Sequence, residues 1–239
     1  MSESQSHRGA HPADQKLFAP SQHATLRQAV SDLSWLLSRD YAPAASLKLV
    51  GDHFKLKERQ RLAVARAACS NQQRERRQQS CLPVAAVAGQ QLLLDGFNLI
   101  VTLEAALSGG VLLNCRDGCL RDISSVHGSY RAVSETERAI QLLGETLLAA
   151  QPAAVTWLLD QPVSNSGRLA QRLRKIALTH NWPWQVEVVF NPDKELRASN
   201  KLAVTADSNI LDYVRRWLNL TPVVIAERLP QAWIVDLQS

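Results

Sequence analysis

The chain has 239 residues, of which 46% are hydrophobic and 21% charged. This composition is typical of a globular protein with a buried core, and it excludes a chain that is disordered throughout. The 27 Lys and Arg residues outnumber the 22 Asp and Glu residues, which gives a formal net charge of +5. The excess is confined to residues 1–90, which carry 13 basic and 7 acidic side chains. We therefore expect the first part of the chain to contact a polyanion.

No apolar run reaches the roughly 18 residues that a membrane-spanning helix needs, so we expect no membrane partner. The first 20 residues lack the apolar segment of a secretory signal, and we interpret them as a disordered tail. The four cysteines do not have the spacing of a zinc site. Reduced thiols in a cytoplasmic protein are the expected state. The oligomeric state is not indicated by the sequence.

Residues 21–75 predict a helical basic module. Apolar residues at helical spacing predict helices at 21–38, 44–50 and 55–70. The polar run 71–80 is either a linker or the solvated end of the third helix, and we assign 76–90 to a linker. Basic side chains that could contact phosphates, or form only a solvated helix face, are His53, Lys55, Lys57, Arg59, Arg61, Arg66, Arg74, Arg76 and Arg77.

From residue 91 to 239, strands and helices alternate, which predicts an α/β domain with a parallel sheet covered on both faces. The expected strands are 91–94, 111–114, 154–159, 185–189, 202–205 and 223–225. The expected helices are 99–107, 134–150, 168–180 and 209–218. A capping box of Ser134 and Glu137 opens the second of these helices. Residues 118–131 are expected to be a polar loop.

Three of these strands end in an acidic residue, namely Asp95, Asp160 and Asp207. Ligands of open α/β sheets bind beyond the carboxyl ends of the strands, so we expect these carboxylates to converge on one site. A hard divalent cation such as Mg²⁺ would neutralise them. Asp212 lies near enough in sequence to join them, and Asn98 could orient a water or a phosphate oxygen. The alternative is that each acid only caps a helix or forms a turn.

Several motifs occur in order along the chain and resemble those of a known superfamily. They are DGFN at 95–98, Glu104, DG..RDIS..HG.Y at 117–130, LDQPVSNSGRLA at 159–170 and TADSNILD at 205–212. This pattern resembles the PIN-like nuclease superfamily, including its NYN branch. The chain is more closely similar to an uncharacterised prokaryotic family that joins a helical domain of unknown function 434, here at 32–70, to a PIN-like domain.

The resemblance implies a metal-dependent nuclease that usually acts on RNA with Mg²⁺ or Mn²⁺. Asp95 matches the acid after the first strand, Asn98 the nearby polar residue, and Asp160 the acid of the central strand. Asp207, with Ser208 beside it, matches the late-strand acid, and Asp212 is a candidate for a fourth. For the acid that such enzymes carry on a helix, the candidates are Glu104, Asp117 and Asp122.

Two loops carry further candidate substrate-binding residues. Ser164, Ser166 and Arg168 precede or open a predicted helix, whose free N–H groups suit a phosphate; simple capping is the alternative. In the loop 118–131, Asp122 could bind metal and Arg121 or His127 a phosphate, or the loop could hold only a surface ion pair.

The leading hypothesis is a metal-dependent nuclease that hydrolyses phosphodiester bonds in RNA. The first alternative is a nucleic-acid-binding protein on the same scaffold without catalysis. The second is a metal-dependent phosphohydrolase that uses the same acids on a small phosphate ester. No Walker A loop or G-x-G-x-x-G motif is present, so the sequence gives no support for a nucleoside triphosphate or dinucleotide site.

Overall fold

A computed structural model describes residues 7–124 and 130–238. Its main sheet has six strands, all parallel, in the order β1-β8-β7-β2-β5-β6. The strands are β1 (Cys81–Leu82), β8 (Trp217–Leu218), β7 (Leu202–Val204), β2 (Gln91–Asp95), β5 (Ala154–Asp160) and β6 (Trp184–Val189). The α/β class with a parallel sheet, expected from the alternation of strands and helices, is confirmed.

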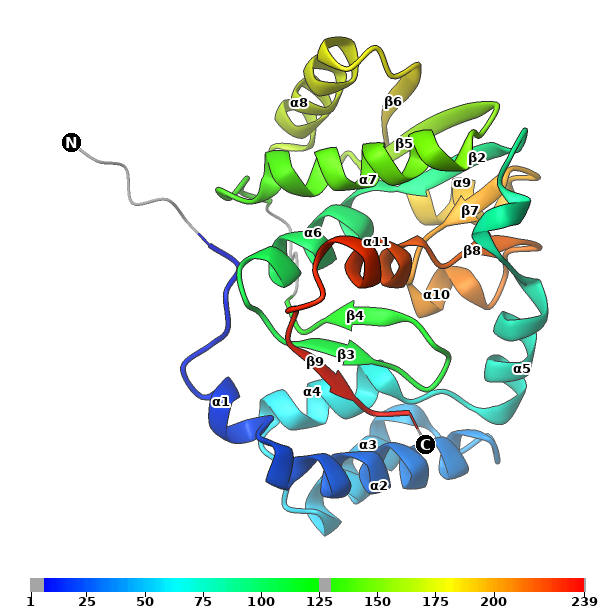
Figure 1. Cartoon of the computed structure of the whole chain (residues 1–239). Helices are drawn as coiled ribbons and strands as arrows, with labels where there is room; N and C mark the ends of the chain where they lie inside the picture. Colours follow the sequence, from blue (N-terminus) through cyan, green and yellow to red (C-terminus); the bar gives the residue numbers. More distant parts are fainter. Residues whose placement is uncertain (1–6, 125–129, 239) are drawn as a thin grey trace.

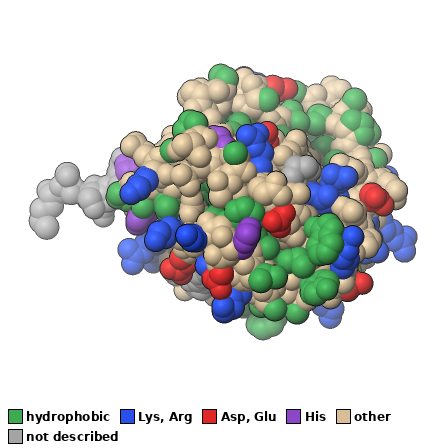
Figure 2. Space-filling view, turned by 90° about the horizontal axis from the view of Figure 1, so that it is seen from below, with side chains coloured by type: hydrophobic (Ala, Val, Ile, Leu, Met, Phe, Trp, Pro, Cys, Tyr) green, Lys and Arg blue, Asp and Glu red, His purple; other side chains and the backbone are tan. Residues whose placement is uncertain are grey.

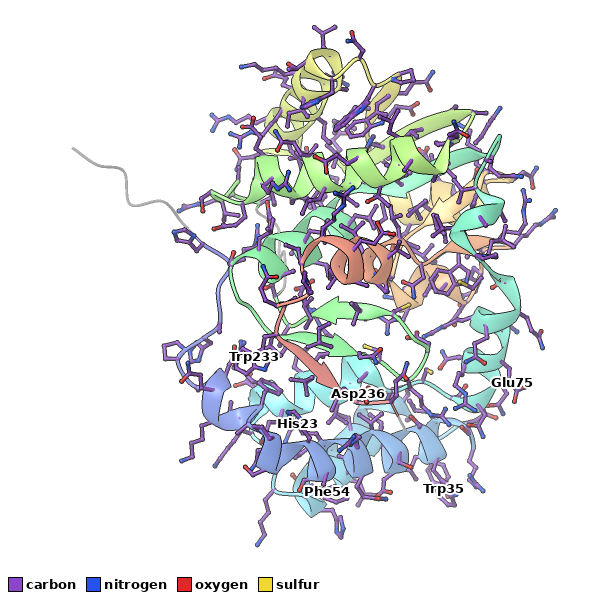
Figure 3. The ribbon with its side chains drawn as sticks, in the orientation of Figure 1. His23, Trp35, Phe54, Glu75, Trp233 and Asp236 are labelled. Atoms are coloured by element: carbon purple, nitrogen blue, oxygen red, sulfur yellow. The ribbon has the colours of Figure 1, made fainter. Side chains whose placement is uncertain are left out.

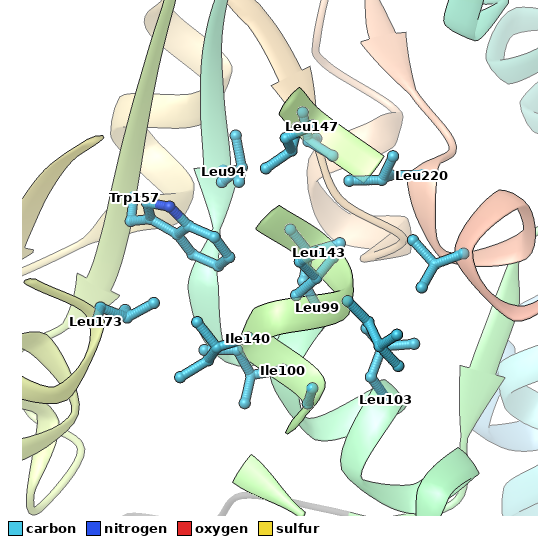
Figure 4. Packing of buried hydrophobic residues seen from close by; sticks show 14 of the residues in the cluster. Leu94, Leu99, Ile100, Leu103, Ile140, Leu143, Leu147, Trp157, Leu173 and Leu220 are labelled. Atoms are coloured by element: carbon cyan, nitrogen blue, oxygen red, sulfur yellow. The ribbon is translucent and has the colours of Figure 1, made fainter. Parts of the chain in front are cut away.

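Alternate residues of each central strand face opposite sides of the sheet. Leu92 and Leu94 pack in the largest hydrophobic cluster, together with helices α6 (Gly96–Leu107), α7 (Thr136–Ala150), α8 (Ser166–Thr179) and α11 (Leu220–Arg228). Figure 4 shows Leu94 and Trp157 of the strands beside Leu143 of α7. Leu93, by contrast, packs in a second cluster with α9 (Pro192–Ala198) and α10 (Ser208–Leu211). The apolar strand sequences are therefore buried on both faces.

A second, three-stranded sheet lies on the side of α6 and α11 that faces away from the main sheet (Figure 1). In it β3 (Leu112–Asn114) pairs antiparallel with β4 (Leu120–Asp122) and parallel with β9 (Ile234–Asp236). Leu112 belongs to the large cluster, whereas its neighbour Leu113 faces the opposite side. The small sheet thus contributes to two hydrophobic cores.

A layer of helices covers the outer face of the small sheet (Figure 1). The helices of this region are α1 (Asp14–Leu17), α2 (Pro20–Leu37), α3 (Pro43–His53), α4 (Glu58–Ala67) and α5 (Asn71–Ser80). Leu33 of α2 and Val64 of α4 share one core with Leu113 and Val235 of the sheet. Figure 3 labels Phe54, at the end of α3, and Trp233, near the carboxyl end of the chain; both pack against this core.

The structure corrects the expectations for the first 90 residues in two places. Of the predicted tail, the described residues 7–20 contain α1 and pack on the fold; Arg8, for instance, is paired with the buried Glu104. The predicted linker 76–90 contains the end of α5, strand β1 and a 3₁₀ helix η1 (Val84–Ala86). Residues 71–80 form their own helix because Ser70 caps it, accepting from the Gln73 N–H at 3.1 Å.

Other differences follow from tertiary pairing. Residues 120–122, expected in a loop, form β4 against β3, and the helix expected at 209–218 ends at Leu211. Trp217 and Leu218 instead form β8, because they extend the sheet beside β7. The strand expected at 223–225 lies within α11. The capping box at Ser134 does not form, since α7 begins without a side-chain cap.

No helix in the described part of the chain is long and apolar enough to cross a membrane. The four cysteines Cys69, Cys81, Cys115 and Cys119 are free thiols.

Candidate active site

The site lies at the carboxyl ends of four neighbouring strands, β7, β2, β5 and β6. The chain continues from β2 toward β5 on one side and from β7 toward β8 on the other, so the strand order reverses between β2 and β7. Such a reversal leaves a crevice at the sheet edge, where ligands of open α/β sheets bind. A cavity of about 450 Å³ is found there, and its wall includes Asp95, Asp160 and Asp207.

Asp95 ends strand β2 and at the same time caps helix α6. Its Oδ1 accepts a hydrogen bond from the backbone N–H of Asn98 at 3.4 Å, and its Oδ2 accepts one from the hydroxyl of Thr205 at 2.8 Å. The capping interaction of the simpler interpretation is therefore present, and it holds the carboxylate at the cavity rather than away from it.

Asp207 occupies the equivalent place after β7 and caps α10, accepting from the N–H of Asn209 at 2.8 Å. Its own N–H donates to the hydroxyl of Thr205 at 3.0 Å. The hydroxyl of Thr205, which is 2% exposed, thus joins the loop of Asp207 to the carboxylate of Asp95. Asn98 makes a second link, because its Oδ1 accepts from the N–H of Ala206 at 2.8 Å.

Asp160 lines the same cavity but stands farther out. Asp95 pairs with Leu158 of β5, so Asp160 lies two residues, or roughly 6.6 Å, farther along the strand direction. In the described part of the chain, no three His, Cys, Asp or Glu side chains are arranged to hold a metal ion together. Asp95, Asp160 and Asp207 therefore share one cavity without forming the close three-carboxylate cluster that the sequence suggested.

A fourth strand-end carboxylate, that of Asp193, was not predicted from the sequence. It lies in the first turn of α9, beyond the end of β6, and lines the cavity. The signal was present in the sequence: an acid follows the predicted strand 185–189 within a few residues, as it does after the other strands. The four neighbouring strands thus each supply one acid to the cavity.

The crowding of these acids changes their ionisation. Burial raises the pKa of Asp95 to about 7; the carboxylates of Asp207 and Asp193 add to the increase, and the hydrogen bond from Thr205 opposes it. Burial also raises the pKa of Asp160, and burial together with the charge of Asp207 raises that of Asp193. A cation bound among them would relieve this repulsion.

Ser208 lines the cavity beside Asp207, as does Arg121. Arg121, however, is committed to internal contacts: its Nε donates to the carbonyl of Ala206 at 2.7 Å, and its Nη2 donates to Asp117 at 2.7 Å. Its guanidinium holds the protein's own backbone, which differs from the expected phosphate contact.

The structure does not bring Asp212, Ser164, Ser166 or Arg168 to the cavity wall. The carboxylate of Asp212 accepts from Arg77 at 2.8 Å and from Gln73 at 2.8 Å, on the side of α5. Ser166 is buried at the start of α8, whereas Ser164 and Arg168 are exposed nearby. Val163 is the part of that loop that reaches the cavity. His127 lies outside the described residues.

The three candidates for an acid on a helix or loop, Glu104, Asp117 and Asp122, lie in different environments. Glu104 is fully buried and accepts hydrogen bonds from Tyr130 and Thr136, and Asp117 is buried between Arg77 and Arg121. Of these three candidates, Asp122 is the one that lines the cavity, and its Oδ2 accepts a hydrogen bond from the hydroxyl of Thr102 at 3.0 Å.

The basic stretch of the helical region does not form one continuous cationic surface. Figure 2 shows its face from below, where Lys and Arg side chains alternate with acidic and hydrophobic ones. Many of the cations are paired within the protein. The pairs are Arg59 with Asp14, Arg61 with Asp52, Arg66 with Asp122, and Arg77 with Asp117 and Asp212.

Comparison with known families gives two matches along the chain. The family described as "Domain of unknown function (DUF5616)" matches residues 84–223, and that described as "Protein of unknown function (DUF434)" matches residues 25–79. The expected order of a DUF434 region followed by an α/β domain is confirmed. The chain is 30% identical over 187 residues to "Uncharacterized protein MJ0935" of Methanocaldococcus jannaschii, covering 78% of this chain and 89% of that protein. No solved structure matches the chain.

Proposed function

The chain belongs to the DUF5616 family, and from its strand-end site we propose that it is a metal-dependent nuclease that hydrolyses phosphodiester bonds in RNA. The observation that carries the proposal is the pair Asp95 and Asp207, joined through Thr205 at the reversal of strand order. The ordered motifs that resemble the PIN-like superfamily, in its NYN branch, agree with a parallel sheet bearing an acid after each central strand.

The donor set fits Mg²⁺ or Mn²⁺. Magnesium keeps several of its waters and is commonly bound by one or two carboxylates together with substrate phosphates, so a three-carboxylate cluster is not required. Asp95 and Asp207 would hold the ion, and the raised pKa of Asp95 marks a negative charge that lacks compensation. When bound, such an ion supplies Lewis acidity toward a phosphate oxygen.

The protein's own residues would divide the remaining tasks. Asp160, which stands farther out along β5 and has a raised pKa, would accept the proton of the attacking water. The amide of Asn98 and the hydroxyl of Ser208 on the cavity wall would orient phosphate oxygens.

The strand ends beside the cavity also carry a feature that suits a nucleic acid. Phe190 follows β6 directly, beside the end of β5, and is 76% exposed. An exposed aromatic ring at such a place offers a face on which an unpaired base can stack. This ring favours an RNA strand over a small phosphate ester as the substrate.

A non-catalytic RNA-binding protein is the second candidate. The observation that favours it is the outward position of Asp160, which leaves no group of three metal-binding side chains in the described residues. This candidate predicts RNA binding without turnover and without dependence on a divalent ion.

The deciding experiment is hydrolysis of end-labelled single-stranded RNA in Mn²⁺, comparing the wild type with Asp95→Asn. We expect cleavage by the wild type and at least a 100-fold lower rate for the variant. Asp236→Asn, at an exposed position of β9 (Figure 3), is the matched control and should cleave like the wild type. Equal cleavage by all three proteins would refute the assignment, and binding without cleavage would select the second candidate.

A further inference from the structure

Helix α5 of the helical region makes a buried contact with the loop that carries Asp207. Arg77, on this helix, has a side chain that is 2% exposed. Its three guanidinium nitrogens reach three different groups: Nη1 donates to Asp117 at 2.7 Å, Nε to Asp212 at 2.8 Å, and Nη2 to the carbonyl of Ser208 at 3.4 Å. A planar guanidinium can span such separated acceptors, which a single ammonium group cannot.

A second buried arginine holds the other side of the same loop. Arg121 donates from Nε to the carbonyl of Ala206 at 2.7 Å and forms an ion pair with Asp117. The carboxylate of Asp117, which is 0% exposed, therefore lies between two guanidinium groups. Asp207 is the residue between the two carbonyls that these arginines contact.

We propose that Arg77, with Arg121 and their shared partner Asp117, is a positioning residue that fixes the backbone on both sides of Asp207 and so aims its carboxylate at the cavity. The inference rests on the proposed function for its catalytic consequence. It assigns the helical region a task other than contact with RNA: through α5, which leads from the helical layer to the main sheet in Figure 1, this region completes the nuclease site.

The arrangement fits a positioning role better than a purely stabilising one. A buried ion pair often contributes little net stability compared with apolar packing of similar volume, because both charges must be desolvated. Here each arginine also donates to a backbone carbonyl of the same short loop. Asp212, one of the predicted site acids, serves this arrangement as the second carboxylate partner of Arg77.

The first test measures the order of the loop without metal or RNA. The amides of Ala206, Asp207 and Asn209 donate hydrogen bonds within the site, so their exchange with solvent deuterium reports local opening. In Arg77→Met we expect exchange at 205–210 to accelerate at least tenfold, while exchange in β2 and β5 stays unchanged. Arg76→Met is the matched control: it removes the same charge from the preceding residue of α5, which is exposed and donates to the carbonyl of Asp212 at 3.0 Å, outside the loop 205–210. It should leave exchange at 205–210 at the wild-type rate.

If Arg77→Met does not fold, Arg77→Lys keeps the buried charge beside Asp117 but cannot reach all three groups. It should show the same local acceleration to a smaller extent. Unchanged exchange at 205–210 in the variant that folds, an equal change in Arg76→Met, or acceleration spread over the whole sheet would overturn the inference.

The second test measures the consequence for the site. Mn²⁺ affinity, followed by calorimetry, should fall at least tenfold in Arg77→Lys, and kcat for RNA cleavage should fall while KM changes less than twofold. Unaltered Mn²⁺ affinity despite a looser loop would overturn the inference. If the wild type neither binds Mn²⁺ nor cleaves RNA, the proposed function fails, and the exchange result alone decides whether Arg77 positions Asp207.

Discussion

At the scale of single residues, two of the strand-end acids each perform two tasks. Asp95 and Asp207 cap the helices that follow them, which satisfies backbone N–H groups, and the same bonds hold their carboxylates at the cavity. Burial and the neighbouring carboxylates raise the pKa of Asp95, so the folded protein retains a proton that the unfolded chain would release. The site is thus maintained at a cost in stability, as is common where groups are arranged for function.

This cost predicts a pH dependence. The pKa of Asp95 is about 7 in the folded protein against an ordinary 3.8, so its ionisation lowers the free energy of unfolding progressively between about pH 4 and pH 7. Asp95→Asn removes that effect. In EDTA we expect the variant to be more stable than the wild type at pH 8, by at most about 4 kcal/mol at ~1.4 kcal/mol per pKa unit, and nearly equal at pH 4.

Thermal unfolding at the two pH values measures this difference. Mg²⁺ should raise the Tm of the wild type at pH 8 but not that of Asp95→Asn. A difference in stability that is the same at both pH values would show that the ionisation of Asp95 is not its cause.

At the scale of elements, the site depends on how closely β2 and α6 approach β5. A Cβ on Gly96, the residue after Asp95, would lie 2.6 Å from Cδ2 of Leu159 and 2.9 Å from the carbonyl of Leu158. Only glycine therefore allows the turn from β2 into α6 at this distance from the neighbouring strand. The glycine of the DGFN motif is explained by packing, not by an unusual backbone angle.

Gly96→Ala is accordingly expected to lower the free energy of unfolding by about 1–3 kcal/mol, the usual cost of overpacking. Because the strain acts next to Asp95, Mn²⁺ affinity should fall as well. Gly167→Ala in the first turn of α8 is the control, since a Cβ there would meet nothing within 4 Å. It should be neutral or stabilise by up to about 1 kcal/mol. Denaturant unfolding compares the two, and equal effects would contradict the packing argument.

At the scale of the whole molecule, the helical region and the α/β region share a core. Leu33 of α2 packs with Val64 of α4 and with Val235 of β9, so the two ends of the chain are buried against each other. The cavity is likewise built from both regions, because Arg66 of α4 lines it together with the strand-end acids. We expect the protein to unfold as one cooperative unit.

Leu33→Ala tests this cooperativity. Leu33 is 2% exposed, and removing its side chain should cost about 2–5 kcal/mol. The transition followed by tryptophan fluorescence and that followed by far-UV circular dichroism should coincide and shift together. Leu178→Ala, at a position that is 80% exposed, should change stability by less than about 0.5 kcal/mol. Two separate transitions, of which only one moves, would refute a single unit.

The local elements with strong patterns were predictable from the sequence. The apolar run at 91–94 and the helical spacing at 21–38 correspond to β2 and α2. Elements that depend on a distant partner were not predictable. Strand β4 forms only against β3, and β8 only against β7, because neither short segment has a distinctive hydrophobic pattern of its own. The strand expected at 223–225 was wrong for a different reason: an apolar run this short fits a buried helix such as α11 equally well.

The sequence by itself determined that acids follow the central strands, since a strand end can be located from the apolar run before it. Only the tertiary structure decided which of them meet. The strand order brings Asp95, Asp207, Asp160 and Asp193 to one cavity, whereas Asp212 and Asp117 are paired with buried arginines. The basic residues show the same division. The sequence gives their number, but contacts between segments far apart in the chain decide which acids they pair with. Charge and hydrophobic periodicity are local properties that can be read along the chain. The composition of the site depends instead on the order in which the strands pair, because that order decides which strand ends lie together.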